Sequence, residues 1–153
     1  MIASRFVQLE VFVTDQETKE LFSRQQEYWK ARDPEALASC HTPDGVVISP
    51  IFRTVTGAAA ILQTYRSLFQ VFPDWDLRAE DLLICGTRVA EPFKAKATHV
   101  GEFMGLAGTR KKVEIQGVRM FELRGNLIAR ERRYYDFTGM LIQLGVLKSK
   151  PSQ

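Results

Sequence analysis

The spacing of hydrophobic residues changes once along the chain, near Pro73. Before this point apolar residues recur every three or four positions, which is typical of a helix with one face in the core. After it they alternate with polar residues, which is typical of strands with one buried face. The sequence therefore predicts helices first and a long run of strands afterwards.

The helix boundaries follow from capping signals. Thr14 and Glu17 have the spacing of a capping box, and a helix is expected over residues 15–31. Asp33 followed by Pro34 predicts a second, short helix that ends near His41. A third helix is expected from Thr56-Gly57 to the residues before Pro73. A last helix is expected from an N-cap at Asp136 to Leu144, where Gly145 stops it.

The strands are predicted from alternation and from turn residues. Pro43-Asp44-Gly45 is a turn signal and precedes a short strand over residues 46–48. Longer strands are expected over 75–85, 88–100, 112–123 and 127–135, and glycines lie in their connections. This order predicts an α+β fold, with helices on one face of a curved sheet.

Length and composition indicate one domain over residues 1–153, with an N-terminal arm over 1–13 and a flexible tail over 148–153. The net charge is +3, and the basic residues form short groups without interleaved exposed aromatics, so no nucleic-acid partner is expected. Cys40 and Cys85 fit neither a zinc motif nor a disulfide framework. The apolar stretches are too short for a membrane span, and Arg5 and Glu10 interrupt any signal sequence. A cytoplasmic location is expected.

Three segments carry a family resemblance. They are Phe72-Pro73-Asp74-Trp75, the stretch THVGEFMG at 98–105, and DFTGML at 136–141 followed by QLG at 143–145. Over roughly residues 15–147 the chain resembles the nuclear-transport-factor-2-like cone, and within it the SnoaL-like polyketide cyclases. The resemblance implies a strongly curved antiparallel or mixed sheet, about three N-terminal helices packed in its concave face, and a short C-terminal helix. It also implies a homodimer through the sheet and chemistry without a metal or cofactor.

The catalytic positions of the cyclases are replaced in this chain. The family His position corresponds to Arg119, the family Asp position to Arg133, and the family Asn position to Ser49. Ketosteroid isomerases of the same fold place a catalytic Asp near the same Ser49. An arginine does not release its proton near neutral pH, so it cannot be a general acid or base. The cyclase mechanism therefore does not transfer by residue identity.

A second set of candidates comes from the alternation of the last two strands. Arg119 lies on a face that is otherwise apolar, and Glu131, Arg133 and Tyr135 share one face of the following strand. We predict that Glu131, Arg119 and Arg133 form the catalytic group, with Glu131 as base and an arginine stabilising an enolate-like oxygen. A β-bulge would reverse which residues of this strand face inward, and would direct Arg133 to solvent.

Other residues are expected to support the site. The predicted substrate-binding residues are Ser49, Tyr65, Phe121, Tyr135 and His99. The alternative for His99 is that it orders the glycine-rich loop by hydrogen bonds, and His41 is expected to cap helix carbonyls.

Three functions are consistent with these residues. The chain is an enzyme of the cyclase or isomerase kind that acts on a carbonyl or ester compound, a binder of a small anion, or a dimeric structural module with a vestigial pocket. An acidic residue inside the cone favours the first, and unpaired arginines favour the second. A closed arginine cluster favours the third.

Overall fold

The computed structural model describes residues 12–148 and 150, so most of the predicted arm and part of the predicted tail lie outside the described residues. The first half contains helices α1 (Asp15–Ala31), α2 (Pro34–Ser39) and α3 (Ala58–Val71), with strands β1 (His41–Ser49) and β2 (Arg53–Thr56) between α2 and α3. The second half contains β3 (Asp76–Ala79), β4 (Leu83–Cys85), β5 (Arg88–Thr98), β6 (Lys112–Arg124), β7 (Leu127–Tyr135) and helix α4 (Phe137–Leu144).

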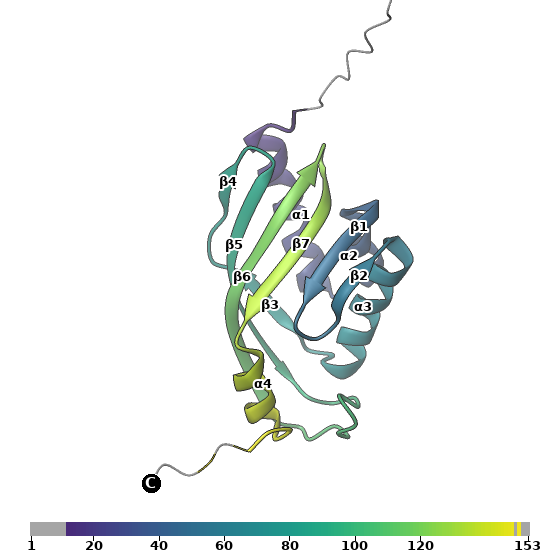
Figure 1. Ribbon diagram of the computed structural model, residues 1–153, viewed down its shortest axis with the longest axis vertical. Coiled ribbons are helices and arrows are strands. Elements are labelled where there is room, and N and C mark those ends of the chain that lie inside the picture. The colour runs from purple at the N-terminus through teal and green to yellow at the C-terminus, as the bar shows by residue number, and fades with distance from the viewer. Residues whose placement is uncertain (1–11, 149, 151–153) are drawn as a thin grey trace, which may run out of the picture.

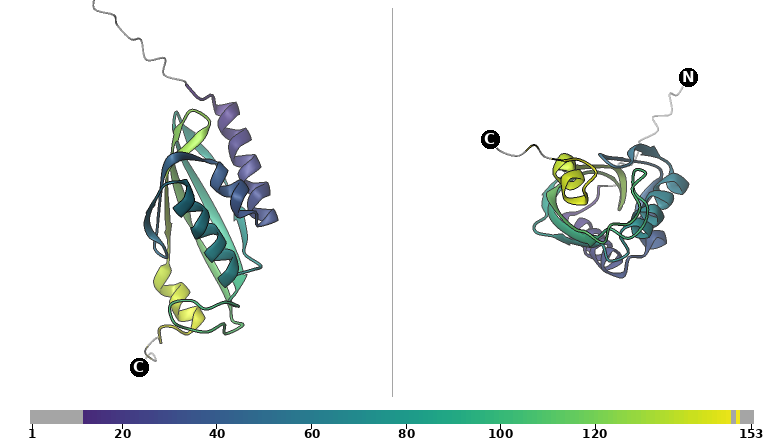
Figure 2. Two further views of the ribbon diagram at one scale, coloured as in Figure 1. Left: turned by 90° about the vertical axis from the view of Figure 1, so that its right-hand side faces the viewer. Right: turned by 90° about the horizontal axis from the view of Figure 1, so that it is seen from below.

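The strands form one mixed sheet. Its order is β2-β1-β7-β6-β5-β3, with β4 paired to β5, and the pairing of β1 with β7 is parallel whereas the others are antiparallel. The sheet curves strongly; α1 to α3 lie against its concave side, and α4 lies at one end (Figures 1 and 2). The predicted α+β cone is therefore confirmed.

Several predicted boundaries are wrong in detail. The strand expected over residues 75–85 is interrupted at residues 80–82, and its two parts pair separately with β5. β1 begins at His41 and includes the predicted turn at Pro43, because its register against β7 shifts between His41 and Val46. A proline lacks the N–H that a regular ladder needs, so it fits at such a shift. β2 was not predicted; it is a polar edge strand without a buried face, so it carries no alternation signal.

The capping signals are confirmed. Thr14 and Glu17 form a reciprocal capping box, and the Asp33 and Asp136 side chains accept hydrogen bonds from backbone N–H groups of α2 and α4. No helix in the described part of the chain is long and apolar enough to cross a bilayer.

A β-bulge sets the inner face of β7. Leu123 pairs with Ile128 while Glu122 pairs with Arg130, so Ala129 is an extra residue. Ile128 is consequently buried, contrary to the simple alternation. Because the bulge precedes Glu131, the residues after it keep the predicted parity, and Glu131 and Arg133 lie on the inner side.

The interior has two hydrophobic clusters. The larger contains Trp29, Tyr65 and Phe93, and the smaller contains Phe22 and Phe121, whose rings meet edge to face at 4.7 Å. The guanidinium of Arg119 lies 5.5 Å from the Trp29 ring and 5.1 Å from the Phe121 ring. A charged group thus lies where the two clusters meet.

The end of β7 approaches β6 very closely. A Cβ atom on Gly117 would lie 1.9 Å from the carbonyl oxygen of Tyr134. Only glycine fits here, because any side chain would collide with the backbone at the end of β7, where Gly117 pairs with Tyr135.

Candidate functional site

Arg119 is held by partners from three elements. It projects from β6 and is 1% exposed. Its Nε donates to Glu91 Oε1 of β5 at 2.9 Å, and its Nη2 donates to the same oxygen and to Gln25 Oε1 of α1 at 3.1 Å. A buried guanidinium requires such partners, because an unpaired buried charge is very costly. Its Nη1 lies 3.6 Å from Glu131 Oε1 and has no hydrogen-bond partner among the described residues.

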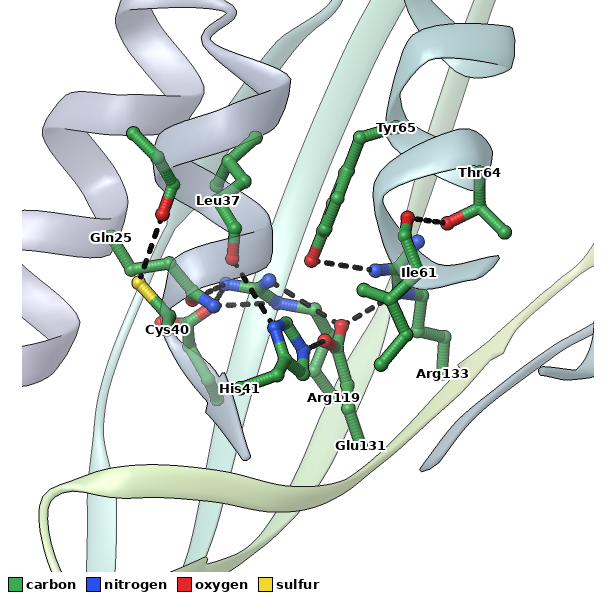
Figure 3. A network of polar contacts seen from close by, with 12 residues as sticks. Gln25, Leu37, Cys40, His41, Ile61, Thr64, Tyr65, Arg119, Glu131 and Arg133 are labelled. Atoms are coloured by element: carbon green, nitrogen blue, oxygen red, sulfur yellow. Dashed lines mark hydrogen bonds and ion pairs between the residues drawn. The ribbon is translucent and has the colours of Figure 1, made fainter. Parts of the chain in front are cut away.

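Glu131 lies at the centre of the polar group and is fully buried. Its Oε1 accepts from Arg133 Nε at 2.6 Å, and its Oε2 lies 3.1 Å from His41 Nε2 (Figure 3). Burial by itself disfavours the carboxylate, but the charge of Arg133, the hydrogen bond of His41 and the charge of Arg119 together hold the pKa of Glu131 well below its usual range. Glu131 is therefore ionised and has both oxygens engaged.

Arg133 lies at the edge of this group, with one tenth of its side chain exposed. Its Nη2 donates to Tyr65 Oη of α3 at 3.3 Å, and its guanidinium lies within 6 Å of the Trp29 and Tyr65 rings. Burial raises the pKa of Tyr65, and nearby Glu131 raises it further, so its hydroxyl stays protonated.

Three members of the network were not predicted as site residues. Glu91 carried a detectable signal, since it alternates with Val89 and Phe93 on the buried face of β5, as Arg119 does on β6. Gln25 is buried on the inner face of α1, and nothing in the local pattern indicates that its side chain accepts from Arg119. His41 does cap the Leu37 carbonyl as predicted, at 3.2 Å from Nδ1. Its contact with Glu131 depends on the parallel pairing of β1 with β7, which the sequence does not indicate.

A small cavity adjoins the two arginines. Its volume is about 20 Å³, and its wall is mainly apolar and aromatic. It is lined by Trp29, Ser49, Ile51, Phe52, Leu68, Trp75, Leu77, Phe93, Ile115, Arg119, Arg133 and Tyr135. Trp29 Nε1, Trp75 Nε1 and Arg119 Nη1 are all buried donors that have no acceptor among the described residues. All three donors belong to residues of the cavity wall, and buried donors normally have a hydrogen-bond partner.

The structure brings most of the predicted residues together. Ser49 and Tyr135 line the cavity with the arginines, and Tyr65 contacts Arg133. Ser49 Oγ accepts from the Phe52 N–H at 3.0 Å, which leaves its own hydrogen free to donate. Burial raises the pKa of Tyr135 to about 12, so Tyr135 is an O–H donor at neutral pH.

Phe121 and His99 are not brought to the cavity. Phe121 belongs to the second hydrophobic cluster, where its ring lies 5.1 Å from the Arg119 guanidinium, and it does not line the cavity. His99 packs against Phe72 and Phe103, and its Nδ1 is 3.0 Å from Thr109 Oγ1. That contact joins the two ends of the glycine-rich loop, which is the alternative role considered for His99. Among the described residues, no group of three or more His, Cys, Asp or Glu side chains is arranged to hold a metal ion.

Solved structures share this cone. AclR from Streptomyces galilaeus, described provisionally as a hydroxylase, is 25% identical, with a TM-score of 0.77 over 90% of this chain and 91% of that one. IdmH from Streptomyces antibioticus, described provisionally as a polyketide cyclase, is 25% identical, with a TM-score of 0.70 over 84% and 98%. A SnoaL-like protein from Jannaschia sp. CCS1 is 19% identical, with a TM-score of 0.78 over 86% and 94%, and shows the fold alone.

The family model for SnoaL-like polyketide cyclase matches residues 19–144. The chain therefore belongs to the SnoaL-like polyketide cyclase family. A comparison with curated proteins finds no match. Family membership, together with these neighbours, supports a cyclase-like role on a small molecule.

Proposed function

We propose that the chain binds a small carbonyl- or ester-bearing compound in the cone and acts on it, without a cofactor, in a cyclase- or isomerase-like step. The observation that carries this proposal is the set of buried N–H donors without acceptors on residues around the cavity, namely Trp29, Trp75 and Arg119. A buried donor without a partner costs about 1–3 kcal/mol. A bound compound that supplies acceptor oxygens recovers this cost.

The shape of the lining supports a compound with an apolar body and oxygen at one end. Leu77, Phe93 and Ile115 supply apolar wall, while Arg119 and Arg133 supply the polar end. A few polar groups in a mainly apolar cavity are typical of small-molecule sites. Arg133 is the more accessible of the two arginines, and its planar fork matches a polarised oxygen.

In the proposed chemistry, the arginines stabilise negative charge that develops on the substrate oxygen. Fixed cations in a dry site are effective at this, because they need no reorganisation during the reaction. Both oxygens of Glu131 are occupied and its pKa is lowered, which favours a role in positioning the arginines over the predicted role as base. In this proposal the α-proton of the compound passes to a water molecule, and the arginines stabilise the enolate oxygen that forms. Ser49 and Tyr135 contact the compound as hydroxyl donors.

Entry of the compound requires local movement. A cavity of about 20 Å³ has room for roughly one water molecule. Ile51 and Phe52, in the turn between β1 and β2, are half-buried lining residues. We place the entrance at this turn, whose outward displacement enlarges the cavity.

The test is a thermal-shift screen against small carboxylates, enolisable β-keto esters and polycyclic aromatic esters. Arg133→Lys keeps the buried charge but removes the fork, and Arg132→Lys on the outer face of the same strand is the matched control. We expect stabilisation of the wild type and the control by at least one class, and affinity about tenfold lower or weaker still in Arg133→Lys. No stabilisation of the wild type by any class, or equal affinity in Arg133→Lys, would contradict the proposal.

A second candidate function is binding of a small anion without turnover, and the occupied oxygens of Glu131 favour it. The two functions differ in whether an α-proton of the bound compound exchanges. For an enolisable β-keto ester in deuterated buffer, an enzyme accelerates deuterium incorporation above the buffer rate, and Arg133→Lys reduces the acceleration. A pure binder leaves the exchange at or below the buffer rate.

We also propose that two copies associate through the outer face of the sheet. Met120 and Tyr134 are exposed there by 42% and 48%, and large exposed side chains on one face are typical of an interface. Sedimentation equilibrium should give twice the chain mass for the wild type and a monomer for Met120→Glu with Tyr134→Glu. A monomeric wild type would contradict this proposal.

A further inference from the structure

His41 makes two hydrogen bonds that each require a proton. Its Nδ1 is 3.2 Å from the Leu37 carbonyl oxygen and its Nε2 is 3.1 Å from Glu131 Oε2 (Figure 3). A carbonyl oxygen only accepts, so Nδ1 carries a hydrogen. The contact between Nε2 and the carboxyl group also needs a hydrogen, since two lone pairs would otherwise face each other. Two guanidinium groups lie beside the other oxygen of Glu131, Arg133 Nε at 2.6 Å and Arg119 Nη1 at 3.6 Å, and they keep this group a carboxylate, so the hydrogen belongs to His41.

The charges of the interior network then do not cancel. With a hydrogen on each ring nitrogen, His41 adds a third positive charge to those of Arg119 and Arg133, against the two negative charges of Glu91 and Glu131. All of them are buried except for the tenth of Arg133 that is exposed. One positive charge is therefore left over, beside a cavity whose residues hold unpaired N–H donors. Uncompensated charge in such a place is costly, and an anion in the cavity removes the cost.

We propose that His41 is a buried imidazolium that makes the cavity selective for the anionic form of its ligand, a carboxylate or an enolate. This inference rests on the proposed function and assigns the charge of the compound that the cavity binds. His41 acts through Glu131: by neutralising that carboxylate, it leaves one positive charge of the two arginines for the ligand. His41 does not line the cavity, so it is a positioning residue: it sets the net charge beside the cavity through Glu131.

The surroundings of His41 are consistent with this charge count. The titratable or charged groups that face it or lie next to it are Glu131 and Arg133 of β7, Arg119 of β6, Tyr65 of α3, whose ring centre is 6.1 Å away, and Cys40 before β1. Burial raises the pKa of the Cys40 thiol to about 11 and also raises that of Tyr65, so both are neutral at pH 7. Neither supplies the missing negative charge.

Binding of an acid and its ester measures the selectivity. Benzoate and methyl benzoate share one apolar body and differ in charge, and calorimetry at pH 7 gives the affinity ratio for each protein. His41→Gln keeps hydrogen-bonding capacity but removes the charge, and His99→Gln, at the other histidine of the chain, is the matched control. We expect benzoate to bind the wild type and the control about tenfold tighter than the ester, or more, and the ratio to fall to about twofold in His41→Gln.

Each outcome separates the two proposals. Equal affinity for acid and ester in the wild type overturns the charge assignment but leaves an oxygen-binding cavity. A ratio that His41→Gln does not change overturns the role of His41. No binding of either compound overturns the proposed function together with this inference. If the variant does not fold, nitrogen-15 NMR of the wild-type histidines decides: two protonated ring nitrogens on His41 at pH 7 support the inference, and an unprotonated Nε2 overturns it.

A second probe distinguishes the carboxylate from the enolate. Benzoylacetone ionises to an enolate with a distinct ultraviolet absorbance. A bound enolate at a pH where the free compound is mostly neutral supports enolate selectivity. Binding of benzoate without any enolate signal assigns the cavity to carboxylates.

Discussion

Arg132 and Arg133 are neighbours on one strand and have opposite environments. Arg133 lies inside the cone, bonded to Glu131 and Tyr65, with one tenth of its side chain exposed. Arg132 lies on the outer face, exposed, and reaches only the hydroxyl of Tyr134 among the described residues, at 3.3 Å. The strand alternation alone separates them.

The comparison shows that exposure to water decides how strongly a charged side chain depends on its partners. An exposed ion pair is worth about 0–1 kcal/mol, because water solvates each group nearly as well as its partner does. Inside the cone every charge depends on the others, since no water replaces a lost partner. The inner group therefore behaves as a unit, whereas the outer arginines act one by one.

The largest loss of stability is expected from replacing Glu131, which lies at the centre of the buried charged group. Glu131→Gln leaves His41, Arg119 and Arg133 with one carboxylate among them, and we expect the free energy of unfolding to fall by about 3–5 kcal/mol. Urea denaturation measures it. The matched control is Glu122→Gln on the outer face, which faces Arg130 at 4.0 Å and should change stability by no more than about 0.5 kcal/mol. Equal effects of the two substitutions would contradict the comparison.

Replacing both Glu91 and Arg119 should lower the free energy of unfolding much less than replacing either residue alone. Glu91→Leu or Arg119→Met alone leaves a buried charge without its partner, and we expect a loss of about 3–5 kcal/mol in each case. The double variant replaces both charged side chains with apolar ones, so no buried charge loses its partner, and it should recover most of the lost stability. A double-mutant cycle by urea denaturation gives the coupling. Additive losses would show that the contact between Glu91 and Arg119 does not couple them.

Lowering the pH should remove the contribution of Glu131 to the stability of the protein. The pKa of Glu131 is lowered in the folded state, so the unfolded chain binds this proton more readily. Its contribution to stability is fully present above its unfolded pKa of about 4.3 and is lost as the pH falls through the lower folded value. We expect the wild type to lose stability more steeply than Glu131→Gln as the pH falls below about 4.3. Parallel curves for the two proteins would be inconsistent with a lowered pKa.

The smallest effect should come from the outer arginine. Arg132→Ala removes an exposed side chain, and we expect the free energy of unfolding to change by no more than about 0.5 kcal/mol. Arg133→Ala, one residue further on, should cost several times as much, because it leaves Glu131 without its 2.6 Å partner. A large effect of Arg132→Ala that depends on protein concentration would instead reveal an interface on the outer face.

Much of the fold and part of the site could be predicted from sequence. Capping residues such as Thr14, Asp33 and Asp136 act within one turn, so local pattern locates their helices. Arg119 and Glu131 were found because alternation assigns strand residues to faces. Glu91 showed the same signal and was overlooked. The bulge at Ala129 left the parity of Glu131 and Arg133 intact only because it precedes them.

Local periodicity is enough to predict the order of the four helices and of the long strands, and to place charged residues on an apolar face. Which of these charges meet depends on the tertiary structure. The parallel pairing of β1 with β7 brings His41 to Glu131, although they are 90 residues apart. The packing of α1 on the sheet brings Gln25 to Arg119. Such contacts depend on how distant elements share one interior, and no short-range pattern records that arrangement.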